Sequence, residues 1–176
     1  DNININTIYN LRKNIGMVLQ DSKIFEGTIK ENISYGNPNA TMDEIINASK
    51  LASAHQFITS LPNGYDTYVS DSSRLSEGEV QLINIARIML QRPPILIFDE
   101  ATSNIDLLTE NLIQNSTKRL AKYSTTIIIA HRLSTIQSCD FIVFLENGRI
   151  VEVGTHNELL NKKGYYYNMY KKQFTI

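Results

Sequence analysis

Two apolar runs, separated by a stretch of helical length, constrain the fold of this chain more than any other feature. They are ILIF (95–98) and TIIIA (126–130), which lack the apolar–polar alternation of a half-solvated strand. Continuous apolar runs are typical of parallel strands covered by helices on both faces. The residues between them, from about Leu107 to Ala121, have the length of a crossover helix. The pattern predicts an α/β fold with a parallel sheet.

Three copies of the pattern S/T-x-x-E predict where helices begin. In this capping box, a hydroxyl residue and a glutamate three positions later satisfy each other's free backbone N–H groups. The helices are expected over about 42–52, over VQLINIARIML (80–90), and after residue 155, where Gly164 interrupts the last one. The three capping pairs are Thr41 with Glu44, Ser76 with Glu79, and Thr155 with Glu158.

Two further segments are predicted to form β-structure. The region between residues 21 and 90 is not. IGMVL (15–19) has the length of a buried strand, and FIVFL (141–145), followed by Asn147-Gly148, predicts a hairpin. Few strand candidates occur between residues 21 and 90. We therefore expect about 21–91 to be a helical subdomain inserted between IGMVL and ILIF.

Composition excludes several classes of protein. The chain has 17 Lys and Arg against 18 Asp and Glu, whereas proteins that bind nucleic acid normally carry a basic excess. Its single cysteine, Cys139, cannot form an internal disulfide, which fits a reducing compartment. No apolar run reaches the roughly 18 residues of a membrane span, and DNININTIYN does not look like a signal peptide.

Two carboxylates directly follow the buried strand ILIF. In open α/β sheets, ligands bind beyond the carboxyl ends of the strands, which is where Asp99 and Glu100 stand. One carboxylate there can hold Mg²⁺, which prefers oxygen ligands, while the other orients or deprotonates a water molecule. The alternative is a solvated acidic turn without a catalytic role.

His131 and Gln20 follow two other strands in the same way. If TTIIIA lies beside ILIF, its end brings His131 close to Asp99 and Glu100, where an imidazole can contact a bound phosphate. Alone, a histidine at this place is more often structural. Gln20 follows IGMVL and, taken alone, reads as a polar surface residue.

The segment RLSEGEVQ allows a structural and a functional interpretation at once. The structural one is the helix cap that Ser76 forms with Glu79. The functional interpretation uses the same helix N-terminus, which has Gly78 beside it. The free N–H groups and the positive end of the helix dipole attract phosphate there.

The order of these segments resembles that of the ATP-binding cassette (ABC) ATPases. Gln20, LSEGE (75–79), ILIFDEATSNID (95–106) and IIIAHR (127–132) correspond to the Q-loop, signature, Walker B with D-loop, and switch histidine of that family. The resemblance implies a P-loop NTPase (RecA-like) parallel-sheet core, formed by 1–20 and 92–176. The helical subdomain of about 21–91 would carry the signature.

The same resemblance implies a role for each matching residue. Asp99 would hold Mg²⁺ through water, and Glu100 would be the general base for the attacking water. His131 would contact the γ-phosphate and hold Glu100, and Gln20 would sense the metal and the water. Four further residues would face ATP bound to an opposing subunit or reach across to it: Ser76, Gly78, Glu79 and Asp106.

The segments FEGTIKENISYG (25–36), LPNGYDT (61–67) and HNELL (156–160) resemble the exporter type. This implies an ATP- and Mg²⁺-dependent ATPase on the cytoplasmic side of the cell membrane, driving efflux of a drug, lipid or peptide. The implied partners are a second nucleotide-binding domain, in a homo- or heterodimer, and a transmembrane domain, through which alone it meets the membrane. The alternatives are a non-catalytic interaction module and an ATPase of chromosomes or repair.

Two departures from the family pattern matter. None of the 8 glycines is followed by lysine, so the P-loop G-x-x-x-x-G-K-[ST] is missing, and only 19 residues precede Gln20. We therefore expect the C-terminal part of a cassette, which binds ATP poorly and is inactive by itself.

The second departure lies in the signature, which reads LSEGE where the family usually has LSGGQ. A carboxylate about 4 Å from a phosphate charge costs on the order of 4 kcal/mol at an effective dielectric near 20. We expect the cap to direct Glu79 toward Ser76 and Glu77 to face solvent. The signature is then weakened but not inactive, as in a heterodimer with one degenerate ATP site.

Overall fold

The structure is a computed structural model, which describes residues 5–19, 23–70, 75–99, 105–130 and 133–174. The chain forms two compact units, residues 1–129 and residues 130–176.

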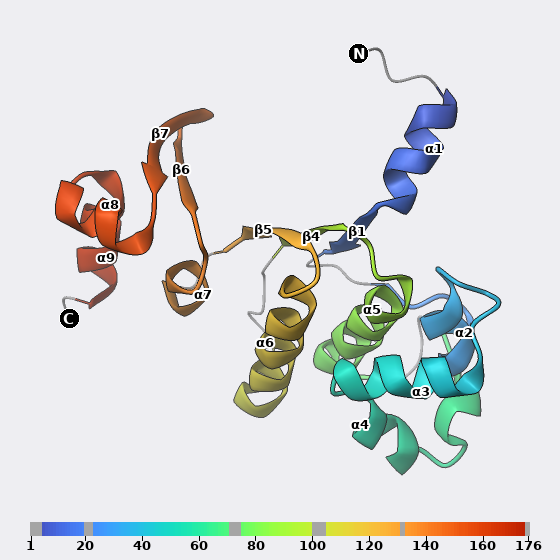
Figure 1. Cartoon of the computed structure of the whole chain (residues 1–176). Helices are drawn as coiled ribbons and strands as arrows, with labels where there is room; N and C mark the ends of the chain where they lie inside the picture. The colour runs from blue at the N-terminus through green and yellow to red at the C-terminus, as the bar shows by residue number, and fades with distance from the viewer. Residues whose placement is uncertain (1–4, 20–22, 71–74, 100–104, 131–132, 175–176) are drawn as a thin grey trace. The chain divides into compact units, whose positions relative to one another are not determined.

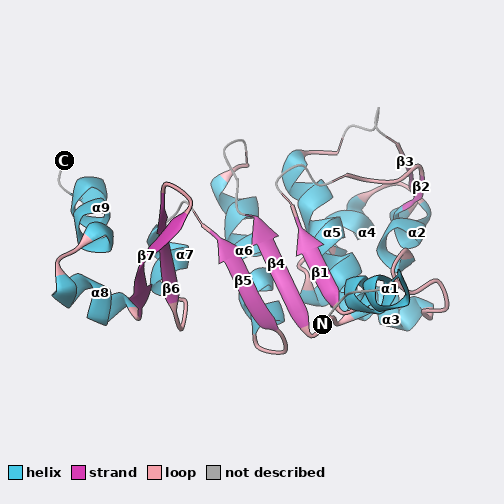
Figure 2. Ribbon diagram, turned by 90° about the horizontal axis from the view of Figure 1, so that it is seen from above, coloured by secondary structure: helices cyan, strands magenta, loops and turns pink. Residues whose placement is uncertain are grey.

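The centre of the first unit is a parallel three-stranded sheet in the order β1–β4–β5 (Figure 2). Val18 lies opposite Phe98 on one side of β4, and Asp99 lies opposite Ile129 on the other. The α/β fold with parallel strands predicted from the apolar runs is therefore confirmed. The strands are β1 (Ile15–Val18), β4 (Ile95–Asp99) and β5 (Thr125–Ile129).

Helices cover one face of this sheet. Helix α5 (Glu77–Gln91) and helix α6 (Leu107–Ala121) lie on the same side of the strands (Figure 1). On the other face, Met17 is 52% exposed and Ile127 55% exposed. The prediction that helices cover both faces is wrong for the described residues. An apolar sequence pattern indicates that both faces of a strand are suited to burial, but it does not show which segment buries them.

Three short helices lie in the region between β1 and β4, two of which pack against α5 and the third against its neighbours. Their core includes Ile29, Ile33 and Ile58, which have no exposed surface, together with the buried Tyr65 and Val69. The strands β2 (Gly27–Thr28) and β3 (Tyr68–Val69) form a small antiparallel pair there, and a short 3-10 turn, η1 (Gly64–Asp66), precedes β3. The helices are α2 (Ile29–Ser34), α3 (Met42–Leu51) and α4 (His55–Ser60).

All three predicted capping boxes form, and a fourth was missed. In each, the hydroxyl side chain accepts from the backbone N–H three residues on, and the glutamate accepts from the backbone N–H of the hydroxyl residue. The missed box joins Thr28 to Glu31 at the start of α2. Helix α1 (Ile5–Lys13) was not predicted either.

The second unit contains the predicted hairpin. Strands β6 (Ile142–Glu146) and β7 (Arg149–Gly154) are antiparallel, and Asn147 and Gly148 between them have the positive φ of a tight hairpin turn. Around the hairpin are α7 (Leu133–Gln137), α8 (His156–Lys162) and α9 (Tyr165–Phe174). The last helical region is interrupted before Tyr165, as the sequence predicts for Gly164.

A buried carboxylate joins β7 to α9. Glu152 is only 5% exposed, and its Oε2 atom accepts a hydrogen bond of 2.9 Å from the backbone N–H of Tyr166, in the first turn of α9. A Cβ atom added at Gly164 would overlap the Glu152 carboxylate. The break between α8 and α9 therefore needs a residue without a side chain.

Candidate functional site

The carboxyl ends of β1, β4 and β5 lie along one edge of the sheet. Asp99 is the last residue of β4, is partly exposed, and stands opposite Ile129 at the end of β5. The prediction that ILIF and TTIIIA are neighbouring strands is confirmed. The chain thus leaves all three strands at the same edge, where ligands of open α/β sheets bind.

Gln20, Glu100 and His131 lie outside the described residues. Gln20 comes two residues after Val18, Glu100 directly after Asp99, and His131 two residues after Ile129. Each therefore follows a strand that ends at this edge. Their convergence on one bound phosphate stays a prediction.

The signature segment begins helix α5. Ser76 is the N-cap, and its backbone N–H and hydroxyl both donate to Glu79 Oε2, at 2.8 Å and 3.0 Å. Glu77 is exposed. Both expected orientations are confirmed, because Glu79 points back to the cap and Glu77 faces solvent.

Asp106 has a structural role as the N-cap of α6. Its Oδ1 atom accepts hydrogen bonds from the backbone N–H groups of Leu108, at 3.1 Å, and Thr109, at 3.0 Å. The pKa of Asp106 lies below its ordinary value, mainly because the Thr109 amide and then the Thr109 side chain donate to the carboxylate. The role across a dimer that the resemblance implies for Asp106 stays a prediction.

Gly78 is buried, and it lies against the first turn of α6. A Cβ atom added there would overlap Thr109 Cγ2 and would lie 3.3 Å from Ile105 Cγ2. Thr109 belongs to the turn that Asp106 caps. The contact joins the signature helix to the Asp106 turn within one chain, which sequence reasoning did not predict. Its only local signal is a glycine in the first turn of a helix, where glycine is unfavourable.

A second arrangement that the sequence did not predict surrounds Arg87, in the C-terminal half of α5. Its guanidinium lies 4.8 Å from the centroid of the Phe25 ring and 5.7 Å from that of Tyr35, and the two rings stack at 4.2 Å. It also donates to the backbone oxygen of Asn32, at 2.7 Å, and to Asn84 Oδ1, at 2.7 Å. Burial lowers the pKa of Arg87 to about 10. Arg87 therefore anchors an exposed aromatic pair to the signature helix.

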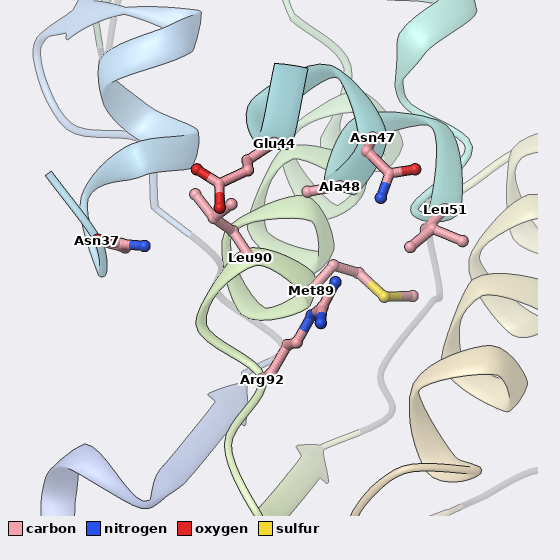
Figure 3. Close-up of a pocket in the computed structure, with 8 residues that line it drawn as sticks. All are labelled: Asn37, Glu44, Asn47, Ala48, Leu51, Met89, Leu90 and Arg92. Carbon is pink, nitrogen blue, oxygen red and sulfur yellow. The ribbon is translucent and has the colours of Figure 1, made fainter. Parts of the chain in front are cut away.

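A pocket of about 230 Å³ lies elsewhere in the first unit, between α3 and the C-terminal end of α5 (Figure 3). Ala48 and Glu44 line it from α3, Met89 lines it from α5, and Arg92 lines it from just after α5. None of the predicted site residues lines this pocket, so it is distinct from the edge of the sheet.

The described ranges contain neither a cluster of metal-ligating side chains nor a membrane-spanning helix. They contain no group of three or more His, Cys, Asp or Glu side chains placed to hold a metal ion. No helix within them has both the length and the apolar character needed to cross a bilayer.

Comparison with known proteins identifies the class. A family model described as "ABC transporter" matches residues 1–103. The Bacillus subtilis (strain 168) protein YgaD, whose name places it among multidrug export ATP-binding/permease proteins, is 53% identical over 167 residues, or 94% of this chain and 28% of YgaD. A Staphylococcus aureus (strain NCTC 8325 / PS 47) protein of the same description is 53% identical over 164 residues, or 93% of this chain and 28% of its own length.

A solved structure gives the same result. The structure of a bacterial Atm1-family ABC exporter with ATP bound matches with a TM-score of 0.87 and 44% sequence identity, over 97% of this chain and 30% of that chain. The chain belongs to the ABC transporter family, and its predicted fold is confirmed. It spans just over a quarter of the length of the curated relatives it matches.

Proposed function

We propose that these 176 residues act within the ATP-binding domain of an ABC exporter that couples ATP hydrolysis to the efflux of a drug, lipid or peptide. The observation that carries the proposal is the register of β4 and β5, in which Asp99 stands beside Ile129. This register places the segments DE (99–100) and AHR (130–132) at the ends of neighbouring strands. The names of the relatives support transport out of the cell.

Each residue at the sheet edge has a proposed role. Asp99 has a partly exposed carboxylate at a strand end, and its oxygen atoms suit Mg²⁺, which would be held through water. Bound Mg²⁺ supplies charge neutralisation for the phosphates. Glu100 polarises the attacking water, His131 contacts the γ-phosphate and holds Glu100, and Gln20 senses the metal and the water.

The sequence has no P-loop, so the backbone N–H groups and lysine that cradle phosphates come from outside these residues. We propose that residues 1–20 and 92–176 belong to the ATPase core and about 21–91 to the helical subdomain. By itself the chain is then inactive and binds ATP poorly.

The proposed partner at the signature is a second nucleotide-binding domain, identical or different. Ser76, Gly78 and Glu79 would face ATP bound to that partner, and Asp106 would reach across to it. The free N–H groups at the start of α5 support this role, since a helix N-terminus attracts phosphate.

The proposed partner on the helical side is a transmembrane domain. Phe25 and Tyr35 are 43% and 61% exposed, and they follow Gln20 closely in the chain. Exposed, fixed aromatic pairs are typical of protein–protein interfaces. We propose that this aromatic pair contacts the cytoplasmic loops of the transmembrane domain, which holds the chain on the cytoplasmic side of the membrane.

The coding sequence upstream of Asp1 provides a direct test. We expect it to encode G-x-x-x-x-G-K-[ST], preceded by about six apolar segments of membrane length. The full-length product is expected to hydrolyse ATP in a Mg²⁺-dependent manner. An open reading frame without a P-loop would instead favour a non-catalytic interaction module.

The signature makes a separate prediction. Replacing Glu77 by glycine in the full-length protein is expected to lower the ATP concentration for half-maximal hydrolysis by about threefold to tenfold, because it removes a negative charge near the proposed phosphate site. Glu79→Gln is expected to change it less than twofold, because glutamine can keep the cap of Ser76.

The control is Asp43→Gly, which removes an exposed carboxylate from the first turn of α3. It should leave ATP hydrolysis unchanged. Equal values for Glu77→Gly and the wild type would show that the altered signature carries no penalty.

A further inference from the structure

Thr109 lies where two of the proposed nucleotide-facing segments meet. Its Cγ2 atom lies against Gly78 in the first turn of α5. Its backbone N–H donates to Asp106 Oδ1 at 3.0 Å. Thr109 thus contacts the signature segment through its methyl group and the Asp106 cap through its backbone amide.

The contact on the signature side leaves no free space. Gly78 is buried, and an added Cβ atom would overlap Thr109 Cγ2. Besides that methyl group, the nearest atoms are Thr109 Cβ and Ile105 Cγ2, both 3.3 Å from the added atom. Close-packed interiors transmit displacements with little loss, so the two first turns are expected to move together.

We propose that Thr109 is a positioning residue, which fixes the LSEGE turn relative to Asp106 so that both segments are presented to a nucleotide as one rigid unit. This inference rests on the proposed function, because only in an ATP-bound dimer do these segments meet nucleotide. Thr109 acts through Gly78 and Asp106 and needs no contact with ATP.

A matched pair of substitutions in the full-length protein separates the two ends of the side chain. Thr109→Ser keeps the hydroxyl and removes Cγ2, which leaves a gap over Gly78. Thr109→Val keeps the methyl group and removes the hydroxyl, while Asp106 keeps its two backbone donors.

We expect Thr109→Ser to raise the ATP concentration for half-maximal hydrolysis threefold to tenfold, with kcat within twofold of the wild type. Thr109→Val should stay within twofold in both parameters. A purely stabilising role would lower the melting temperature of Thr109→Ser without this KM change, and such a result would overturn the proposal.

A double substitution tests why position 78 is glycine. Gly78→Ala is expected to raise the half-saturating ATP concentration at least tenfold. Adding Thr109→Ser removes the overlapping methyl group and should return the value to within threefold of that of Thr109→Ser alone. If Gly78→Ala stays equally impaired in the double variant, the glycine serves the approach of phosphate and not the packing of α6, and the proposal fails.

Thr117→Ser is the matched control, because it removes the same methyl group from α6 about 12 Å further along the helix axis. It should behave as the wild type. Hydrogen exchange supplies a readout that needs no turnover: backbone amides of residues 79–82 should exchange faster in Thr109→Ser than in Thr109→Val. Absence of ATP hydrolysis in the wild type would overturn the proposed function, whereas equal exchange in the two variants would overturn the role of Thr109.

Discussion

Replacing Glu100 by glutamine in the full-length protein is expected to lower kcat for ATP hydrolysis by about 100-fold to 1,000-fold. Glutamine has the size of glutamate but cannot accept a proton from the attacking water. A positioned general base contributes about 10² to 10⁴ in rate, so the predicted loss is at the lower end of that range. The half-saturating ATP concentration should change much less, because the proposed role of Glu100 is to contact the attacking water and not the nucleotide.

Steady-state ATP hydrolysis at saturating Mg²⁺ and ATP measures this effect. The control is Glu146→Gln, which makes the same change on an exposed residue at the end of β6 and should leave kcat unaltered. A Glu100→Gln variant that keeps more than half of the wild-type kcat would remove Glu100 from the mechanism and favour the solvated acidic turn.

Replacing Gly164 by alanine is expected to destabilise the second unit by about 2–4 kcal/mol. The new Cβ atom would overlap the Glu152 carboxylate, which is buried and hydrogen-bonded to the Tyr166 amide. Overpacking a dense interior costs about 1–3 kcal/mol. Displacing the carboxylate adds the cost of a buried donor left unsatisfied, about 1–3 kcal/mol, partly relieved by adjustment of α9.

Hydrogen exchange of the α9 amides, together with urea denaturation, measures this loss. Gly36→Ala is the control, because the nearest atom to its added Cβ is Gln91 Oε1 at 3.4 Å, an ordinary contact distance. It should change stability by less than about 0.5 kcal/mol. If the two alanine variants unfold alike, Glu152 does not require the glycine.

The elements that depend on local chemistry could be predicted from the sequence. Capping boxes need two residues three positions apart, and the three predicted pairs all form in the structure. Thr28 and Glu31 match the same pattern, but the helix that they cap has only 6 residues, which gives little periodic signal. Helix α1 was missed because its sequence, INTIYNLRK, is rich in polar residues and weak helix formers.

Only the part of the candidate site that depends on the order of strands along the chain could be predicted from the sequence. Asp99 ends β4, and Gln20, Glu100 and His131 come within two residues of a strand end, so a parallel sheet is enough to bring these positions to one edge. The contacts of Arg87 with Asn32 and of Gly78 with Thr109 join residues that are far apart in the sequence. They arise from how α5 packs against its neighbours, which no local pattern encodes.

The position of Arg87 on α5 has a mechanical consequence. The same 15-residue helix begins at the capped LSEGE turn and, roughly 16 Å further along its axis, carries the guanidinium that supports Phe25 and Tyr35. A displacement of the two rings would act on α5 directly, because the Arg87 guanidinium lies over both rings and donates to the backbone oxygen of Asn32. Such a displacement would either tilt α5 or break the Arg87 contacts, and a tilt of α5 would shift the LSEGE turn at its N-terminus.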